Sequence, residues 1–123
     1  MTDPDLIILY VNDVPASEAF YAGLLGKAPV ESSPAFAMFV LANGQRLGLW
    51  ALHTVEPAAV ATGGGGELCI ALDGDAAVDA LHADWQARGL TFAQPPTSME
   101  FGHTFVALDP DSHRLRVYSP IPR

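Results

Sequence analysis

The chain has 123 residues, of which half are hydrophobic and 16% are charged, and its formal net charge is −8. This length and composition indicate one compact folded domain rather than a disordered chain or two ordinary domains. The acidic balance opposes binding to nucleic acid or to an anionic membrane surface, so neither is an expected partner.

The N-terminal half begins with a predicted strand and a predicted helix. Residues 6–11 are a β-rich apolar run, and Asn12-Asp13 then offers capping chemistry for a helix over residues 15–25. Gly26 is placed to stop that helix. Three apolar side chains recur at helical spacing and are expected to form its buried stripe: Phe20, Leu24 and Leu25.

Two further strands and a glycine-rich linker complete this half. Residues 36–41 and 47–52 are apolar and flank Asn43-Gly44, which is a strong hairpin signal. Residues 62–66 read Thr-Gly-Gly-Gly-Gly and are expected to be flexible. They are not a phosphate-binding loop, because no Gly-Lys-Ser/Thr follows them.

The same order of elements restarts after the linker. Residues 68–72 are a predicted strand and residues 75–88 a predicted helix, with His82 on its solvent side. Extended chain resumes at residues 90–92 and is expected to break at Pro95-Pro96. The buried stripe of the helix is predicted to contain Val78, Leu81 and Trp85.

A tight turn joins the last two predicted strands, within residues 102–118. Asp109-Pro110-Asp111-Ser112 suits a type I turn, because Pro110 fixes φ at the second position and Asp109 can accept from the backbone ahead of it. Two halves therefore repeat one order of elements, as an internal duplication predicts. The expected organisation is one domain over residues 1–123, made of module 1–60 and module 67–123 joined by the linker 62–66.

Several short motifs resemble the vicinal oxygen chelate superfamily, which contains glyoxalase I, extradiol dioxygenases and bleomycin-resistance proteins. They are an Asp-containing turn, a Phe-Tyr and Leu-Leu-Gly helix, and an Asp-Pro-Asp turn before the last strand, at residues 11–14, 20–26 and 109–113. Ser112 stands where the family usually has Gly. The resemblance implies an α+β fold of two βαβββ modules that form a concave mixed sheet with helices outside. It also implies a homodimer whose pocket is built partly from both chains.

Side chains alternate faces along a strand, so the implied fold selects the residues that line the cavity. The expected ligand-binding residues are Ile8, Tyr10, Phe36, Met38, Trp50, Glu67, Arg116 and Tyr118. Cys69 follows Glu67 in the same run and is expected to be a buried, inert thiol. As the only cysteine, it can form no disulfide within the chain.

Metal-dependent members of the superfamily hold their ion with ligands on the first, fourth, fifth and eighth strands. The matching positions here are Leu6, the Leu49-Trp50 pair, Glu67 and Arg116. A divalent ion needs three or more lone-pair donors, and only Glu67 supplies one, so no metal, cofactor or catalytic residue is expected. No serine or cysteine lies in a recognisable nucleophile motif. A metal site made of His53, His103, His113 and Glu67 stays open as an alternative.

Within the superfamily, the chain looks most like the phenazine-antibiotic resistance proteins, through Leu49-Trp50, the segment 102–105 and Arg116-Val117. Those proteins bind planar tricyclic antibiotics and are thought to protect by sequestration. The resemblance implies that Trp50 is a stacking platform and that Arg116 clamps a carboxylate or phenolate on a planar aromatic molecule. The alternative is that Trp50 belongs to the core and that Arg116 pairs with Glu67 as a structural ion pair.

The expected function is therefore metal-independent binding and sequestration of a phenazine-like antibiotic by a protein that is not an enzyme. The open alternatives are a metal-dependent lyase or oxygenase of the glyoxalase or dioxygenase type, a small-molecule sensor, and a bleomycin-type drug-binding protein in which Glu67 selects a cation. The acidic residues 1–5 lack the layout of a secretion signal, and no apolar run is long enough to cross a bilayer, so the cytoplasm is the expected compartment.

Overall fold

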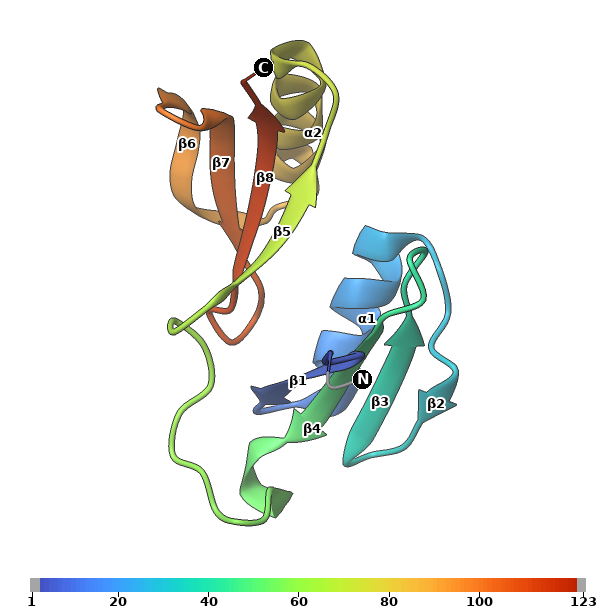
Figure 1. Cartoon of the computed structure of the whole chain (residues 1–123). Coiled ribbons are helices and arrows are strands. Elements are labelled where there is room, and N and C mark those ends of the chain that lie inside the picture. The colour runs from blue at the N-terminus through green and yellow to red at the C-terminus, as the bar shows by residue number, and fades with distance from the viewer. Residues whose placement is uncertain (1–2, 122–123) are drawn as a thin grey trace. The chain divides into compact units, whose positions relative to one another are not determined.

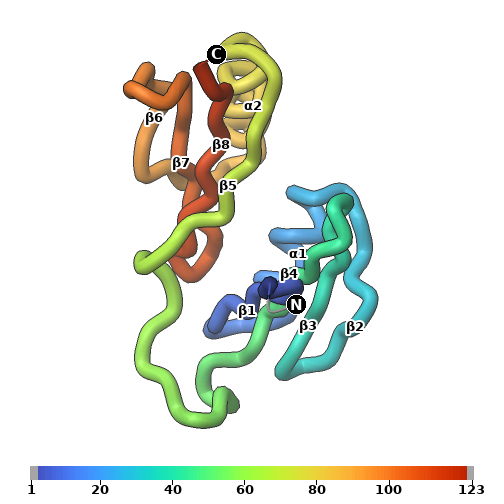
Figure 2. The backbone as a smooth tube through the Cα atoms, viewed as in Figure 1, coloured from blue at the N-terminus to red at the C-terminus, as the bar shows by residue number. Residues whose placement is uncertain are grey.

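The computed structural model describes residues 3–121 and separates into two compact units, Met1–Gly63 and Gly64–Arg123 (Figure 1). Each unit contains one α-helix and one four-stranded mixed sheet. The tube in Figure 2 follows the same course twice: a strand, a helix and three further strands. This confirms the predicted α+β class with a repeated βαβββ order. No helix of the described residues is long and apolar enough to cross a membrane.

The sheet of the first unit has the strand order β1-β4-β3-β2. β1 (Leu6–Val11) runs parallel to β4 (Arg46–Ala51), which pairs antiparallel with β3 (Phe36–Val40). β2 (Glu31–Ser32) adds a short antiparallel edge, and the 3-10 helix η1 (Leu52–Thr54) follows β4. β2 was not predicted, because two residues carry no periodic signal.

The first helix, α1 (Val14–Leu25), is capped by the residues that the sequence indicates. The side chain of Asp13 accepts a hydrogen bond from the Ala16 backbone N–H at 3.1 Å, and Gly26 ends the helix with φ of 67°. The prediction of which α1 side chains form the buried stripe was wrong. The buried side chains are Val14, Ser17 and Tyr21, whereas Phe20, Leu24 and Leu25 are half-buried. Phe20 lies at the margin of this face, edge-on to Tyr21.

The sheet of the second unit has the strand order β5-β8-β7-β6. β5 (Glu67–Ala71) runs parallel to β8 (Arg114–Pro120), and β7 (Gly102–Leu108) pairs antiparallel with β8. β6 (Thr91–Met99) is the other edge strand. It runs through Pro95-Pro96, so the predicted break there was wrong. An edge strand tolerates proline because one side of it needs no ladder donors, and a register shift between Gln94 and Thr97 spans the two prolines.

The second helix, α2 (Asp75–Ala87), covers one face of this sheet with Val78 and Trp85 buried and Leu81 half-buried. His82 was expected to face solvent, and this was wrong. Its ring lies 4.5 Å from the Phe92 ring and 5.3 Å from the Phe105 ring, measured between centroids. The sequence does not reveal this contact, because the two phenylalanines come from β6 and β7.

The turn between β7 and β8 has the predicted hydrogen bonds. The Asp109 carboxylate accepts from the backbone N–H groups of Asp111 and His113, each at 2.9 Å. The Ser112 N–H donates to the Asp109 carbonyl at 3.1 Å. Ser112 has φ of 66°, in the left-handed region that favours glycine, which explains why a glycine suits this position better.

Candidate functional site

The face of the first sheet that α1 leaves open carries all the binding residues predicted for this unit. Strand pairing aligns two rows across β1, β4 and β3, which are Tyr10, Trp50 and Phe36, and then Ile8, Gly48 and Met38. The alternate residues lie under α1 and are buried, among them Ala37, Phe39, Leu47 and Leu49. The open face is therefore an apolar and aromatic wall that is partly exposed, with Ile8 at 38%.

Gly48 shapes the middle of this wall. A Cβ at Gly48 would lie 3.1 Å from the Cζ atom of Phe36 and 3.4 Å from the Cγ1 atom of Ile8. The absence of a side chain thus allows both neighbours to lie close over the strand. Next to it, Tyr10 and Trp50 meet edge to face, with ring centroids 6.4 Å apart and an interplanar angle of 74°. Such rings offer flat surface to a planar ligand.

Arg116 of β8 lies on the open face of the second sheet and is bound by Glu67 of β5. The Nε atom of Arg116 donates to Oε1 of Glu67 at 2.8 Å, and Nη2 donates to Oε2 at 3.0 Å. Nη1 donates to the Gln94 side-chain oxygen at 3.3 Å and to the Thr104 hydroxyl at 3.2 Å. Because a guanidinium has five N–H groups, this network uses most of its donors.

This geometry is the structural ion pair of the alternative interpretation. The fork that was expected to clamp a ligand carboxylate already holds Glu67, in the planar bidentate arrangement that arginine favours. Hydrogen bonds from Arg116 lower the pKa of Glu67, opposed by partial burial, and the same bonds raise the pKa of Arg116. Arg114 adds a second positive charge, with its Nη1 atom 3.7 Å from Oε2 of Glu67.

Two aromatic residues and the cysteine complete this face. Tyr118 was predicted here, but Phe101 was not, because it lies between β6 and β7 where strand alternation does not apply. Phe101 is 45% exposed and packs edge-on to Tyr118, with ring centroids 6.4 Å apart. The Cζ atom of Arg116 lies 5.6 Å from the centroid of the Phe101 ring. Cys69 was expected to be buried, and this was wrong: it is exposed and pairs in register with Arg116.

The positions that correspond to the family's metal ligands do not form a donor set here. Leu6 and Leu49 have no lone-pair donor, and both carboxylate oxygens of Glu67 accept from Arg116. Over residues 3–121, no three His, Cys, Asp or Glu side chains are grouped so that they could hold an ion. Of the histidines in the alternative metal site, His103 binds Asp79, at 2.7 Å, and His113 is buried beside the β7–β8 turn.

Comparisons with known proteins agree with this fold. The family model of the glyoxalase/bleomycin resistance protein/dioxygenase superfamily matches residues 4–117. The phenazine antibiotic resistance protein EhpR of Enterobacter agglomerans is 30% identical over 117 residues, which cover 93% of this chain and 89% of EhpR.

Solved structures show the same architecture. The solution NMR structure of protein ATC0852 from Agrobacterium tumefaciens is 60% identical, with a TM-score of 0.91 and coverage of 99% of this chain and 100% of that one. A glyoxalase-related enzyme from Fulvimarina pelagi is 24% identical, with a TM-score of 0.83 and coverage of 97% and 88% respectively, and so shows a shared fold only.

Proposed function

The chain belongs to the glyoxalase/bleomycin resistance protein/dioxygenase superfamily, and on that premise we propose that it binds and sequesters a planar aromatic molecule of the phenazine kind without a metal ion. Sequestration of an antibiotic in this way confers resistance without chemical change. The observation that carries the proposal is the row Tyr10, Trp50 and Phe36 on the open face of the first sheet. Each stacked pair of rings contributes about 1 kcal/mol beyond the burial of its area.

The charges on the open face of the second sheet favour an anionic or neutral ligand. Glu67 contributes −1 and Arg114 and Arg116 contribute +1 each, which gives a local sum of +1 in a chain whose net charge is −8. Both oxygens of Glu67 are occupied by Arg116, so Glu67 is a poor selector for a cationic drug. A planar aromatic acid therefore fits this face better than a bleomycin-type cation.

We also propose that the chain acts as a homodimer. Apolar side chains remain partly exposed on the open face of the first sheet, among them Ile8 and Val40. Exposed apolar patches on soluble proteins commonly mark contact with a partner or a ligand. Light scattering during size-exclusion chromatography is expected to give twice the mass of one chain.

Tryptophan fluorescence tests the proposal, because the two tryptophans of the chain report different places. Trp50 lies on the open face of the first sheet, whereas Trp85 is 3% exposed and packs edge-on to Phe105 at 5.5 Å. Phenazine-1-carboxylic acid is expected to quench the wild-type protein in a saturable manner. Trp85→Phe should retain that saturable quenching, and Trp50→Phe should lose most of it.

Two further measurements separate sequestration from chemistry. Mass spectrometry of the phenazine after long incubation should return the compound unchanged, and EDTA should leave the dissociation constant unaltered. Trp50→Ala should weaken binding by about tenfold, as expected for loss of a stacking partner worth about 1–1.5 kcal/mol. Equal quenching in Trp50→Phe and Trp85→Phe, or conversion of the phenazine, would contradict the proposal.

A further inference from the structure

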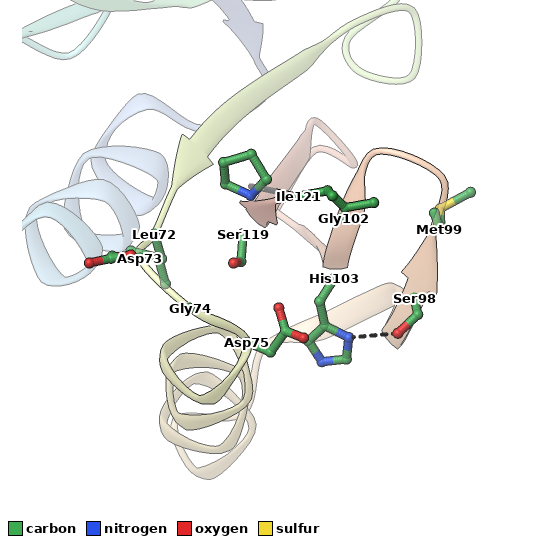
Figure 3. Close-up of a pocket in the computed structure, with 11 residues that line it drawn as sticks. Leu72, Asp73, Gly74, Asp75, Ser98, Met99, Gly102, His103, Ser119 and Ile121 are labelled. Carbon is green, nitrogen blue, oxygen red and sulfur yellow. Dashed lines mark hydrogen bonds between the residues drawn. The ribbon is translucent and has the colours of Figure 1, made fainter. Parts of the chain in front are cut away.

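A cavity of about 440 Å³ lies within the second unit, away from the residues of the proposed binding faces. Figure 3 shows its wall, which comes from the start of α2, the end of β6 and the start of β7, and the end of β8. Ser98 and His103 line it together, and Figure 3 shows the hydroxyl and the imidazole turned toward each other. None of the eight residues predicted for ligand binding contributes to this wall.

A serine, a histidine and an aspartate are connected in series at this cavity. The Oγ atom of Ser98 lies 3.3 Å from Nδ1 of His103, and Nε2 of His103 lies 2.7 Å from Oδ1 of Asp79. An ionised carboxylate can only accept, so the short contact to Asp79 assigns the imidazole proton to Nε2. Nδ1 is then a lone-pair acceptor directed at the Ser98 hydroxyl.

The fold positions the three side chains from three elements. Ser98 and His103 are direct cross-strand partners in the β6–β7 hairpin, which places their side chains on the same face. That face is the one α2 covers, and Asp79 lies on α2 and reaches the His103 ring. The serine is exposed and the histidine side chain is only 16% exposed, so the base is held while the hydroxyl stays accessible.

We propose that Ser98 is a nucleophile for acyl transfer from small uncharged carboxylic esters, with His103 as its general base and Asp79 as the residue that orients His103. The three side chains take the roles of a serine hydrolase relay with the two ring nitrogens exchanged, because the hydroxyl meets Nδ1 and the carboxylate meets Nε2 of His103. This activity is independent of the proposed sequestration of aromatic molecules, because it uses different residues. The 3.3 Å contact is long for a reacting pair, as is common before a substrate is bound.

The reaction balances with water as the only co-reactant. The Ser98 oxygen forms a bond to the acyl carbon while its proton passes to Nδ1 of His103. The bond between the acyl carbon and the alcohol oxygen then breaks, and the alcohol leaves with that proton. Water attacks the acyl-serine in the same way, gives its proton to His103, and releases the carboxylic acid as Ser98 regains its hydrogen.

The remaining wall of the cavity indicates the kind of ester. Leu72, Met99 and Ile121 supply apolar surface for a short acyl or alkyl group, and Asp73 and Asp75 disfavour an anionic ester. Gly74 and Asp75 also line the cavity at the start of α2, where the first backbone N–H groups have no acceptor within the helix. The positive partial charge of these groups offsets part of the repulsion that Asp73 and Asp75 exert on a developing oxyanion.

Covalent labelling and ester hydrolysis test this assignment on the full chain. A fluorophosphonate reagent is expected to add once per chain, at Ser98, and p-nitrophenyl acetate is expected to be hydrolysed faster than in buffer. Ser98→Ala should abolish the label and lower the hydrolysis rate by at least about 100-fold, the usual contribution of nucleophile and base. Asp79→Asn should lower kcat by about tenfold or more with little change in KM, because Asp79 contacts His103 and not the ester.

Two control variants keep the test specific. Asp84→Asn removes another exposed acid of α2, one that pairs with Arg88, and should leave labelling and hydrolysis unchanged. Ser119→Ala removes the other serine of the cavity wall and should leave the label on Ser98. Absence of labelling in the wild-type protein overturns the proposal, as does a label that survives Ser98→Ala or disappears in Ser119→Ala. Circular dichroism of each variant identifies any that fails to fold.

Discussion

Replacing Glu67 with Gln should destabilise the second unit by about 1–2 kcal/mol at pH 7. The pair with Arg116 is bidentate, and the side chains of Glu67 and Arg116 are 26% and 18% exposed. Its contribution to the free energy of unfolding should therefore lie between those of exposed and buried ion pairs. Fully exposed pairs contribute about 0–1 kcal/mol, and breaking a buried pair costs about 3–5 kcal/mol. Glutamine keeps the shape and one acceptor, and the loss therefore falls near the lower part of this interval.

The pH dependence of this difference has a definite sign. Arg116 lowers the pKa of Glu67 in the folded state relative to the unfolded state, so the stabilisation is fully present above the ordinary pKa of 4.5. It is lost as the pH falls through the lowered pKa of the folded protein. The wild-type protein and Glu67→Gln should thus differ at pH 7 and converge in stability at acid pH.

Urea unfolding in a Trp50→Phe background measures this prediction, because Trp85 then reports the second unit alone. Glu100→Gln, an exposed acid between β6 and β7, is the matched control and should change the free energy of unfolding by less than about 0.5 kcal/mol. A loss below about 0.3 kcal/mol in Glu67→Gln, or a loss that persists undiminished at pH 3, would refute the reasoning.

Three stability predictions concern the backbone, each measured by urea unfolding. Ser112→Gly should stabilise the second unit by about 0.5–1 kcal/mol, because φ at this position is 66°; an unchanged or lower stability would contradict this. Asp13→Ala should cost about 1 kcal/mol through loss of the α1 cap, whereas Asp13→Asn should cost less. Gly102→Ala should cost at least about 3 kcal/mol, since φ is 149° and a Cβ would overlap the Ser119 carbonyl oxygen; a fully stable variant would show that the turn rearranges freely.

The sequence predicted those parts of the fold that depend on local chemistry. Asp13 and Gly26 mark the ends of α1 because capping is decided within a few residues. The strands at β3, β4 and β5 differ from the predicted ranges by no more than one residue at either end. The open-face positions, such as Trp50 and Arg116, follow from alternation along a strand once one buried position is known.

The errors occur where the neighbours come from distant segments. Pro95-Pro96 fits within β6 only because that strand lies at an edge, which is a property of the sheet. Cys69 looked like a core residue because its strand is apolar, but α2 covers the other face. Ser98 and His103 lie five positions apart in no known motif, and Asp79 joins them only when α2 packs on the sheet.

The exposed Cys69 beside Arg116 makes the second open face accessible to covalent chemistry at one site. Since the chain has no other cysteine, a maleimide or a fluorescent iodoacetamide would attach there alone. A bound ligand that covers Arg116 would shield the Cys69 sulfur and slow its alkylation. The rate of alkylation therefore reports ligand binding, even for a ligand that has no chromophore. Screening colourless compounds against this protein therefore requires only a timed thiol reaction.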